Sequence, residues 1–184
     1  MIIGITGSFG AGKGAVVDYL VKTKEFTHYS ASGYITEEIK KRGLPVDRDS
    51  MIAVGNDLRA KHGPSHIVEV LFERARDKGG DAVIEALRAV GEVRKLKELG
   101  AFIIGVDADP KIRYERSVKR GSEKDQVSFE KWQVQEKEES NTNDPTKQNI
   151  FGALTQSDYV IENNGTMEEL QKEVDKFLEA YADK

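Results

Sequence analysis

The stretch GSFGAGKG at residues 7–14 is the feature that most constrains how this chain can fold. It follows the short apolar run MIIGIT and precedes a segment whose apolar residues recur at helical spacing. A glycine-rich turn between a buried strand and a helix directs several backbone N–H groups to one point at the positive end of the helix. Phosphate oxygens bind at such points, so the pattern predicts a phosphate-binding loop.

The loop departs from the usual G-x-x-x-x-G-K-[ST] pattern at its last position. Gly14 and then Ala15 follow Lys13, so no hydroxyl is available to contact Mg²⁺. The backbone N–H groups and Lys13 remain, and Mg²⁺ in phosphate sites keeps several of its waters. We therefore expect phosphate binding with a weaker protein hold on the metal. The loop residues expected to contact the nucleotide are Gly7, Ser8, Gly10, Ala11, Gly12, Lys13, Gly14 and Ala15.

Strand-like and helix-like segments alternate along the whole chain, which is typical of a parallel sheet with helices on both faces. The predicted strands are 1–6, 26–30, 79–87, 100–108 and 157–163. We expect a single three-layer α/β/α domain over 1–184 with a five-stranded parallel sheet. Within it, 31–80 is predicted to be a helical acceptor-binding region and 117–150 a polar, lid-like segment. A capping box of Thr166 and Glu169 predicts the start of the last helix.

Composition limits the classes of partner. The net charge is −4, which disfavours binding to nucleic acid through a broad phosphate footprint. The chain has no cysteine, which excludes disulfides and thiolate zinc sites. No apolar run approaches the ~18 residues that span a bilayer, and no signal peptide is recognisable. We expect a cytoplasmic protein with small-molecule nucleotide partners and no membrane contact; its oligomeric state is not predicted.

The third predicted strand ends in VIEALR, residues 83–88. An acid at the end of a strand beside a phosphate loop can orient a Mg²⁺-bound water, which makes Glu85 the candidate metal residue. Arg88 follows three residues later. The alternative is a surface Glu–Arg pair, but burying an idle carboxylate in an apolar run is costly, which favours a functional role.

Three arginines lie at i, i+3 and i+7 of the helix expected over 109–120: Arg113, Arg116 and Arg120. Guanidinium groups suit triphosphate oxygens and transferring charge. The alternative is a solvated helix face. We favour Arg116 and Arg120 for the phosphate role and hold Arg113 as a third candidate. The very polar residues 121–149 fit either a mobile cover over the site, helical in its middle, or a disordered loop.

Taken together, several motifs resemble dephospho-CoA kinases and the adenylate and deoxynucleoside monophosphate kinases. They are GITGSFGAGKG, VIEALRAVGEV, IIGVDADPKIRYERSVKRG, the glutamine-bearing stretch around Gln135, and SDYVIENNGTMEEL. The resemblance implies ATP and Mg²⁺ as cofactors. It implies that Arg116 and Arg120 are lid arginines. It also implies that the turn after the last strand lies near the adenine, through Asn163, Asn164 and Gly165.

The acceptor side departs from the dephospho-CoA kinase pattern. Those enzymes carry an acidic motif after the second strand, whereas this chain has Ser30 and Ser32 there. No carboxylate is placed to take a proton from an alcohol. A nucleoside monophosphate attacks through an ionised phosphate oxygen and needs no base.

Residues 51–64 resemble the acceptor region of some deoxynucleoside monophosphate kinases. This similarity makes Asn56 and Arg59 acceptor-facing candidates, with a surface helix as the alternative. The full set of acceptor candidates is Arg59, Asn56, Arg88 and Ser32.

The sequence therefore predicts ATP-dependent phosphoryl transfer to a small nucleotide, with a (deoxy)nucleoside monophosphate favoured. The predicted catalytic residues are Lys13, Arg88, Arg116 and Arg120. Three alternatives stay open. One is a dephospho-CoA kinase with an altered base, another is a non-catalytic nucleotide-binding switch or partner protein, and the third is a kinase for a modified nucleotide or a nucleic-acid end.

Overall fold

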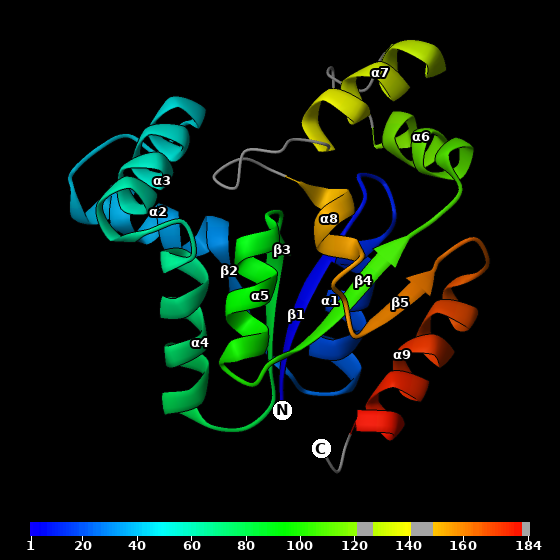
Figure 1. Cartoon of the computed structure of the whole chain (residues 1–184), viewed down its shortest axis with the longest axis horizontal. Coiled ribbons are helices and arrows are strands. Elements are labelled where there is room, and N and C mark those ends of the chain that lie inside the picture. The colour runs from blue at the N-terminus through cyan, green and yellow to red at the C-terminus, as the bar shows by residue number, and fades with distance from the viewer. Residues whose placement is uncertain (121–126, 141–148, 182–184) are drawn as a thin grey trace.

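The computed structural model describes residues 1–120, 127–140 and 149–181. Its centre is a five-stranded sheet in the order β2-β3-β1-β4-β5, in which every neighbouring pair is parallel. The strands are β1 (Ile2–Gly7), β2 (Thr27–Ser30), β3 (Ala82–Leu87), β4 (Phe102–Asp107) and β5 (Tyr159–Glu162). All five therefore end at one edge of the sheet, the upper edge in Figure 1. The predicted parallel five-stranded sheet is confirmed.

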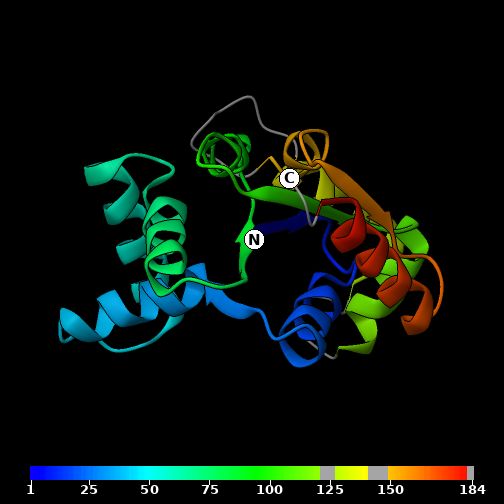
Figure 2. The ribbon, with the colours of Figure 1, turned by 90° about the horizontal axis from the view of Figure 1, so that it is seen from below.

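Apolar residues on successive strand positions face opposite sides and build two cores. Ile104 of β4 packs with α1 (Lys13–Thr23) and α9 (Met167–Tyr181), whereas its neighbour Ile103 packs with α4 (His66–Lys78), α5 (Val90–Glu98) and α8 (Ile150–Leu154). Figure 2 shows α1 and α9 on one side of the sheet and α5 and α8 on the other. Because consecutive strand side chains point to opposite faces, continuous apolar runs such as FIIGV require helices on both faces.

Two further helices extend the molecule beyond the β2 edge, within the predicted region 31–80. Ser30 accepts a hydrogen bond from Gly33 N (3.3 Å) and caps α2 (Ala31–Lys41), and Asp47 accepts one from Ser50 N (2.8 Å) and caps α3 (Arg48–His62). Their buried apolar residues join the core on the α4 side. In Figure 1 α2 and α3 stand above α4, at the level of the upper edge of the sheet.

On the other side of the upper edge, α6 (Pro110–Lys119) packs against α7 (Phe129–Ser140) (Figure 1). Tyr114 lies edge-on to both Phe129 and Trp132, and its hydroxyl donates to Val127 O over 2.7 Å. The helix expected in the middle of 121–149 is thus present as α7. The parts of the lid-like segment at 121–126 and 141–148 lie outside the described residues.

The start of α9 has the predicted capping box. Thr166 N donates to Glu169 Oε2 (2.8 Å), and Glu169 N donates to Thr166 Oγ1 (3.3 Å). The short helix α8 is an addition that the sequence did not predict. Among the described residues, none of the helices is long and apolar enough to cross a membrane.

Candidate active site

The loop between β1 and α1 wraps a point at the upper edge of the sheet, and its glycines make the close packing feasible. Gly7, Gly10 and Gly12 have φ angles of +148°, +76° and +101°. A Cβ on Gly7 would lie 2.1 Å from Val106 O, and a Cβ on Gly10 would lie 2.4 Å from Arg113 O. The loop is therefore held directly against β4 and α6, and Ser8 N donates to Val106 O (3.1 Å) and Ala11 N to Ser8 O (3.3 Å). Its last residues lead into the first turn of α1, where backbone N–H groups can line an anion site.

Lys13 lies over this loop. Its Nζ donates to Gly7 O (2.7 Å) and Ser8 O (2.8 Å). The pKa of Lys13 is lowered to about 8, mainly by burial and then by the charges of Arg88, Arg120 and Arg113, while Asp107 opposes them. A cation held near other cations in a partly buried place is stabilised by an incoming anion, so this is the arrangement that a polyphosphate would complete.

Ser8 carries a further signal of a missing partner. Its Oγ is buried and has no hydrogen-bond partner in the described part of the chain. A buried hydroxyl left without a partner is costly, and a phosphate oxygen at the loop would satisfy it. The loop residues therefore fit a nucleotide phosphate.

The three arginines predicted on this helix, two within α6 and Arg120 at its C-cap, have different surroundings. Arg113 is buried: it forms an ion pair with Glu136 of α7, donates to Ala108 O (2.8 Å), and lies 5.3 Å from the centre of the Trp132 ring. It anchors α7 and is not free to bind phosphate. Of the other two, Arg120 donates to Ser117 Oγ (3.4 Å) and lies close enough to Lys13 to lower its pKa.

The turn after β5 is fixed against the phosphate loop by Asn163. The buried Asn163 side chain donates through Nδ2 to Ala11 O (2.7 Å), and its backbone N donates to Asp107 O (2.7 Å). Arg116 donates through Nη1 to Asn163 O (2.9 Å), so its guanidinium group lies at this turn.

The next two residues of the turn are held as well. Asn164 Oδ1 accepts a hydrogen bond from Asp109 N (2.7 Å), and a Cβ on Gly165 would lie 1.8 Å from Glu169 Oε2. The structure thus brings two separately predicted groups, the loop and the Asn-Gly turn, together.

Ser30, the last residue of β2, is the register partner of Glu85 within β3. Glu85 Oε1 lies 3.3 Å from Nε2 of His28, a residue that the sequence did not single out. Ser30 Oγ is 2.7 Å from Ser32 Oγ, so the first serine is used in capping α2 and in this contact. Glu85 is a partly exposed acid next to the loop strand, as a residue holding metal-bound water would be.

A metal would depend mainly on the nucleotide. The described residues contain no group of three or more His, Cys, Asp or Glu side chains suited to hold a metal ion. A Cβ on Gly14 would meet nothing within 4 Å, so the place of the missing hydroxyl is open. These residues fit a Mg²⁺ ion that would be held by nucleotide oxygens and, through a water molecule, by one acid.

Phe9, at the tip of the loop, was also missed by the sequence analysis. Its ring centre lies 5.9 Å from Lys13 Nζ and 6.0 Å from Arg88 Cζ. An aromatic ring flanked by two cations offsets part of their repulsion, so Phe9 holds the exposed Arg88 near the phosphate loop.

Arg59 reaches across from α3 toward the start of α5. Its Nη2 lies 3.9 Å from Oε1 of Glu92, whose other oxygen accepts hydrogen bonds from the backbone N of Arg88 (2.9 Å) and of Ala89 (3.2 Å). Asn56 on the same helix is exposed, as is Ser32. Arg59 and Arg88 are therefore connected through Glu92, another residue that the motifs did not reveal.

The family model for an AAA domain, AAA_18, matches residues 3–144. The UPF0200 protein TK1334 of Thermococcus kodakarensis is 29% identical over 97% of each chain, and a UPF0200 protein of Methanococcus vannielii is 30% identical over 97% of this chain and 91% of its own.

Two solved structures show the same fold. The shikimate kinase of Aquifex aeolicus has a TM-score of 0.56 at 18% identity and covers 99% of this chain and 98% of its own. TT1252 of Thermus thermophilus has a TM-score of 0.62 at 18% identity and covers 98% of this chain and 97% of its own. These likenesses establish a P-loop kinase-like fold. The sequence match identifies the chain as a member of the UPF0200 family, built on an AAA-type P-loop domain.

Proposed function

We propose that this protein transfers the γ-phosphoryl group of ATP to a small anionic acceptor, with a nucleoside monophosphate as the favoured class. One observation supports this most directly: Lys13 lies over a glycine loop, partly buried, with its pKa lowered by burial and by three arginines. Phosphoryl transfer needs positioning and charge neutralisation rather than covalent chemistry, and such a cation cluster supplies both.

On the donor side, the loop N–H groups and Lys13 would bind the outer phosphates, and Arg120 would close over them. Arg116 contacts Asn163 O, which supports a place nearer the base, beside Asn163, Asn164 and Gly165. Glu85 would hold Mg²⁺ through water. When bound, Mg²⁺ would neutralise charge on the transferring phosphates.

On the acceptor side, Arg59 and Arg88 would bind the acceptor phosphate; these two residues are called the acceptor clamp below. Guanidinium groups bind phosphate in a bidentate manner, and the ionised phosphate oxygen attacks without a general base. Ser32 and Asn56 are exposed and would contact the acceptor from α2 and α3. In this proposal 31–80 binds the acceptor and 117–150 covers the donor.

A second candidate is transfer to a hydroxyl group of a negatively charged small molecule, such as dephospho-CoA or a hydroxylated carboxylic acid. The Glu85–His28 pair favours it, because a partly exposed carboxylate in the second half of β3 is an available proton acceptor. One similar structure is a shikimate kinase in complex with shikimate, a hydroxylated carboxylic acid that an arginine clamp could also hold. A protein that binds nucleotide without turnover is the remaining alternative.

An ATP-consumption screen decides among these classes. The acceptors are the ribo- and deoxyribonucleoside monophosphates, dephospho-CoA, shikimate and gluconate. We expect the highest kcat/KM for a nucleoside monophosphate and slow turnover of dephospho-CoA. Rapid turnover of a hydroxyl acceptor would support the second candidate, and ATP binding with no turnover of any acceptor would favour the non-catalytic alternative.

Arg59→Ala tests the acceptor clamp. It should raise the acceptor KM by about 10-fold and leave the ATP KM nearly unchanged, because one charged hydrogen bond is lost on the acceptor side only. Lys61→Ala is the matched control, since Lys61 is an exposed cation on the same helix that pairs with Asp57. If both substitutions changed the acceptor KM equally, Arg59 would not be part of the acceptor site.

A further inference from the structure

We propose that Glu92 is a positioning residue that places both arginines of the acceptor clamp; this inference rests on the proposed function. Glu92 is a carboxylate with 7% of its surface exposed, in the first turn of α5. Burying a charge is costly unless it is paired and hydrogen-bonded, so its contacts define what it does.

One oxygen of Glu92 fixes the backbone that carries Arg88. Oε2 accepts hydrogen bonds from Arg88 N (2.9 Å) and Ala89 N (3.2 Å) at the start of α5. The carbonyl of Arg88 is held separately, by Asn149 N (2.8 Å). The main chain of Arg88 is therefore fixed at both its N–H and its C=O, and its side chain extends from a rigid base toward Phe9.

The other oxygen of Glu92 faces the second arginine. Oε1 lies 3.9 Å from Nη2 of Arg59, which comes from α3. About a third of the Arg59 side chain is exposed. A guanidinium group has five N–H donors, so contact with one carboxylate oxygen leaves donors for a phosphate. Glu92 thus sets the Arg59 side chain without consuming its binding capacity.

Gly55 contributes to the same placement. A Cβ on Gly55 would lie 3.3 Å from Arg59 Nη1 and 3.2 Å from Ile35 Cδ1. The guanidinium group therefore lies over Gly55 on α3. A methyl group at this position would require the Arg59 guanidinium group and Ile35 Cδ1 to move by a few tenths of an ångström, while the charge of Arg59 and Glu92 stay in place.

The combined arrangement also has an electrostatic consequence. Two arginines that bind one phosphate repel each other, and a carboxylate that binds the Arg88 backbone and lies 3.9 Å from the Arg59 guanidinium group offsets part of that repulsion. Glu92 lies in the first turn of α5, where the helix dipole interacts favourably with an acidic side chain.

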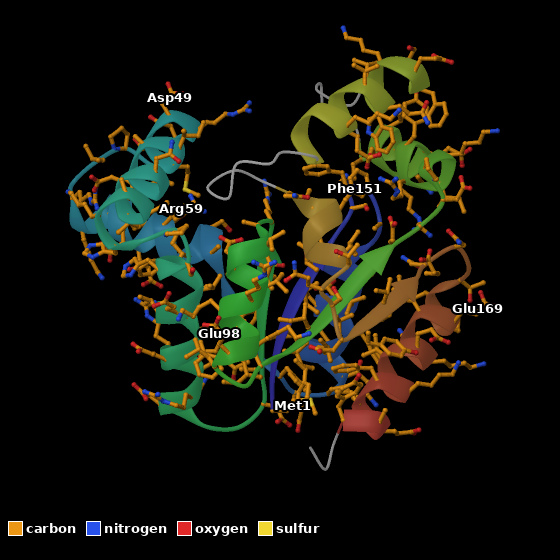
Figure 3. The ribbon with its side chains drawn as sticks, in the orientation of Figure 1. Met1, Asp49, Arg59, Glu98, Phe151 and Glu169 are labelled. Carbon is orange, nitrogen blue, oxygen red and sulfur yellow. The ribbon has the colours of Figure 1, made fainter. Side chains whose placement is uncertain are left out.

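Kinetics of Glu92→Gln test the proposal. The amide oxygen can still accept a backbone hydrogen bond, but the charge facing Arg59 is lost. We expect the acceptor KM to rise about 10-fold with the ATP KM changed by less than about 2-fold, for the nucleoside monophosphate that gives the highest kcat/KM in the screen. Glu98→Gln is the control, because Glu98 lies at the far end of α5, away from Arg59, and pairs with Lys95 (Figure 3).

A double-mutant cycle separates positioning from general destabilisation. If Glu92 acts through Arg59, then Arg59→Ala combined with Glu92→Gln should raise the acceptor KM by about 10-fold, not by the ~100-fold product of independent effects. Multiplying effects, or an unchanged acceptor KM with a lower melting temperature, would overturn the proposal. Gly55→Ala, with Glu92 intact, should raise the acceptor KM as well. This variant tests the placement of Arg59 even if Glu92→Gln does not fold.

A readout independent of turnover distinguishes failure of this inference from failure of the proposed function. In ¹⁵N NMR spectra of the full chain, the Arg59 Nε–Hε signal, identified by its loss in Arg59→Ala, should shift in Glu92→Gln and in Gly55→Ala, but not in Glu98→Gln. If the signal does not move, the positioning role is wrong even when a kinase activity is found. If it moves and no acceptor is phosphorylated, the proposed function fails and the positioning of Arg59 stands.

Discussion

Asn163 Nδ2 donates a hydrogen bond to Ala11 O over 2.7 Å, which joins the turn after β5 to the middle of the phosphate loop. Both residues are buried, and a Cβ on Gly12 would lie only 2.4 Å from the same Nδ2. The loop is thus supported from the side on which a nucleotide base is proposed to lie.

Replacing Asn163 should affect stability and ATP binding together. Asn163→Ala leaves the Ala11 carbonyl without its donor, which should cost about 1–3 kcal/mol in the free energy of unfolding. The ATP KM should rise by roughly 10-fold while the acceptor KM changes little. Urea unfolding and initial-rate kinetics measure the two effects. Gln156→Ala, which removes only an exposed contact to Arg94, should change neither the free energy of unfolding nor the ATP KM. A destabilised variant with an unchanged ATP KM would place the base elsewhere.

Lys13 gives ATP binding a defined pH dependence. Its pKa in the folded chain is about 8, below the ordinary 10.5, so its proton is lost as pH rises through 8. ATP phosphates favour the protonated form, so binding above pH 8 should take up a proton and weaken between pH 7 and 9.5. Calorimetry of ATP binding in two buffers of different ionisation enthalpy measures the uptake. Lys13→Met should abolish the uptake, whereas Lys24→Met, which removes a distant ion pair to Asp175, should keep it.

The same lysine should affect catalysis and folding in opposite ways. Lys13→Met should lower kcat/KM by at least ~10²-fold, since one electrostatic stabiliser of the transferring phosphate is lost. A lysine whose pKa is lowered in the folded chain contributes stability that is fully present above pH 10.5. That contribution is lost as the pH falls through 8. At pH 7 the charged Lys13 therefore opposes folding, and without nucleotide the variant should be no less stable than the original chain. An undiminished kcat/KM would place the phosphates at a different location.

The sequence predicted what local pattern controls. Apolar runs and turn residues located the five strands, and the glycine spacing located the loop, because both depend on residues that are neighbours in the chain. It could not predict contacts between distant segments. Arg113 occurs at helical spacing with Arg116 and Arg120, yet its partner Glu136 belongs to another helix, so periodicity alone could not separate an anchoring arginine from a phosphate-binding one.

Glu92 and His28 were missed for the same reason. Glu92 has no Ser or Thr at the N-cap, where Ala89 stands, so no capping box marked it in the sequence. His28 is one residue of a short strand, and only the register with β3 brings it to Glu85. Phe9 lies within the loop pattern itself, but the pattern leaves that position undefined.

Restoring a hydroxyl after Lys13 should strengthen the hold on Mg²⁺. A Cβ at Gly14 would have open space, so Gly14→Ser should fit without strain, whereas Ala15 packs against the core and leaves less room for Thr. Gly14→Ser should lower the Mg²⁺ concentration for half-maximal activity, and Gly14→Ala, the control for the added carbon, should not. The same half-maximal concentration in all three proteins would show that the missing hydroxyl is already compensated.

The stacked pair His62 and His66 should make the junction of α3 and α4 sensitive to acid. Their ring centres are 4.4 Å apart, and burial, together with the charge of His62, lowers the pKa of His66, against smaller opposing effects of Glu69 and Glu38. A histidine whose folded pKa is lowered adds stability that is full above its ordinary pKa of 6.5 and is lost as pH falls through the lowered value. The urea midpoint should therefore fall between pH 7.5 and pH 5.5. His66→Phe should flatten this dependence, and His62→Asn should flatten it in part, because only one of the two causes is removed. Parallel pH profiles for the original chain and His66→Phe would show that protonation of His66 does not control the stability of this junction.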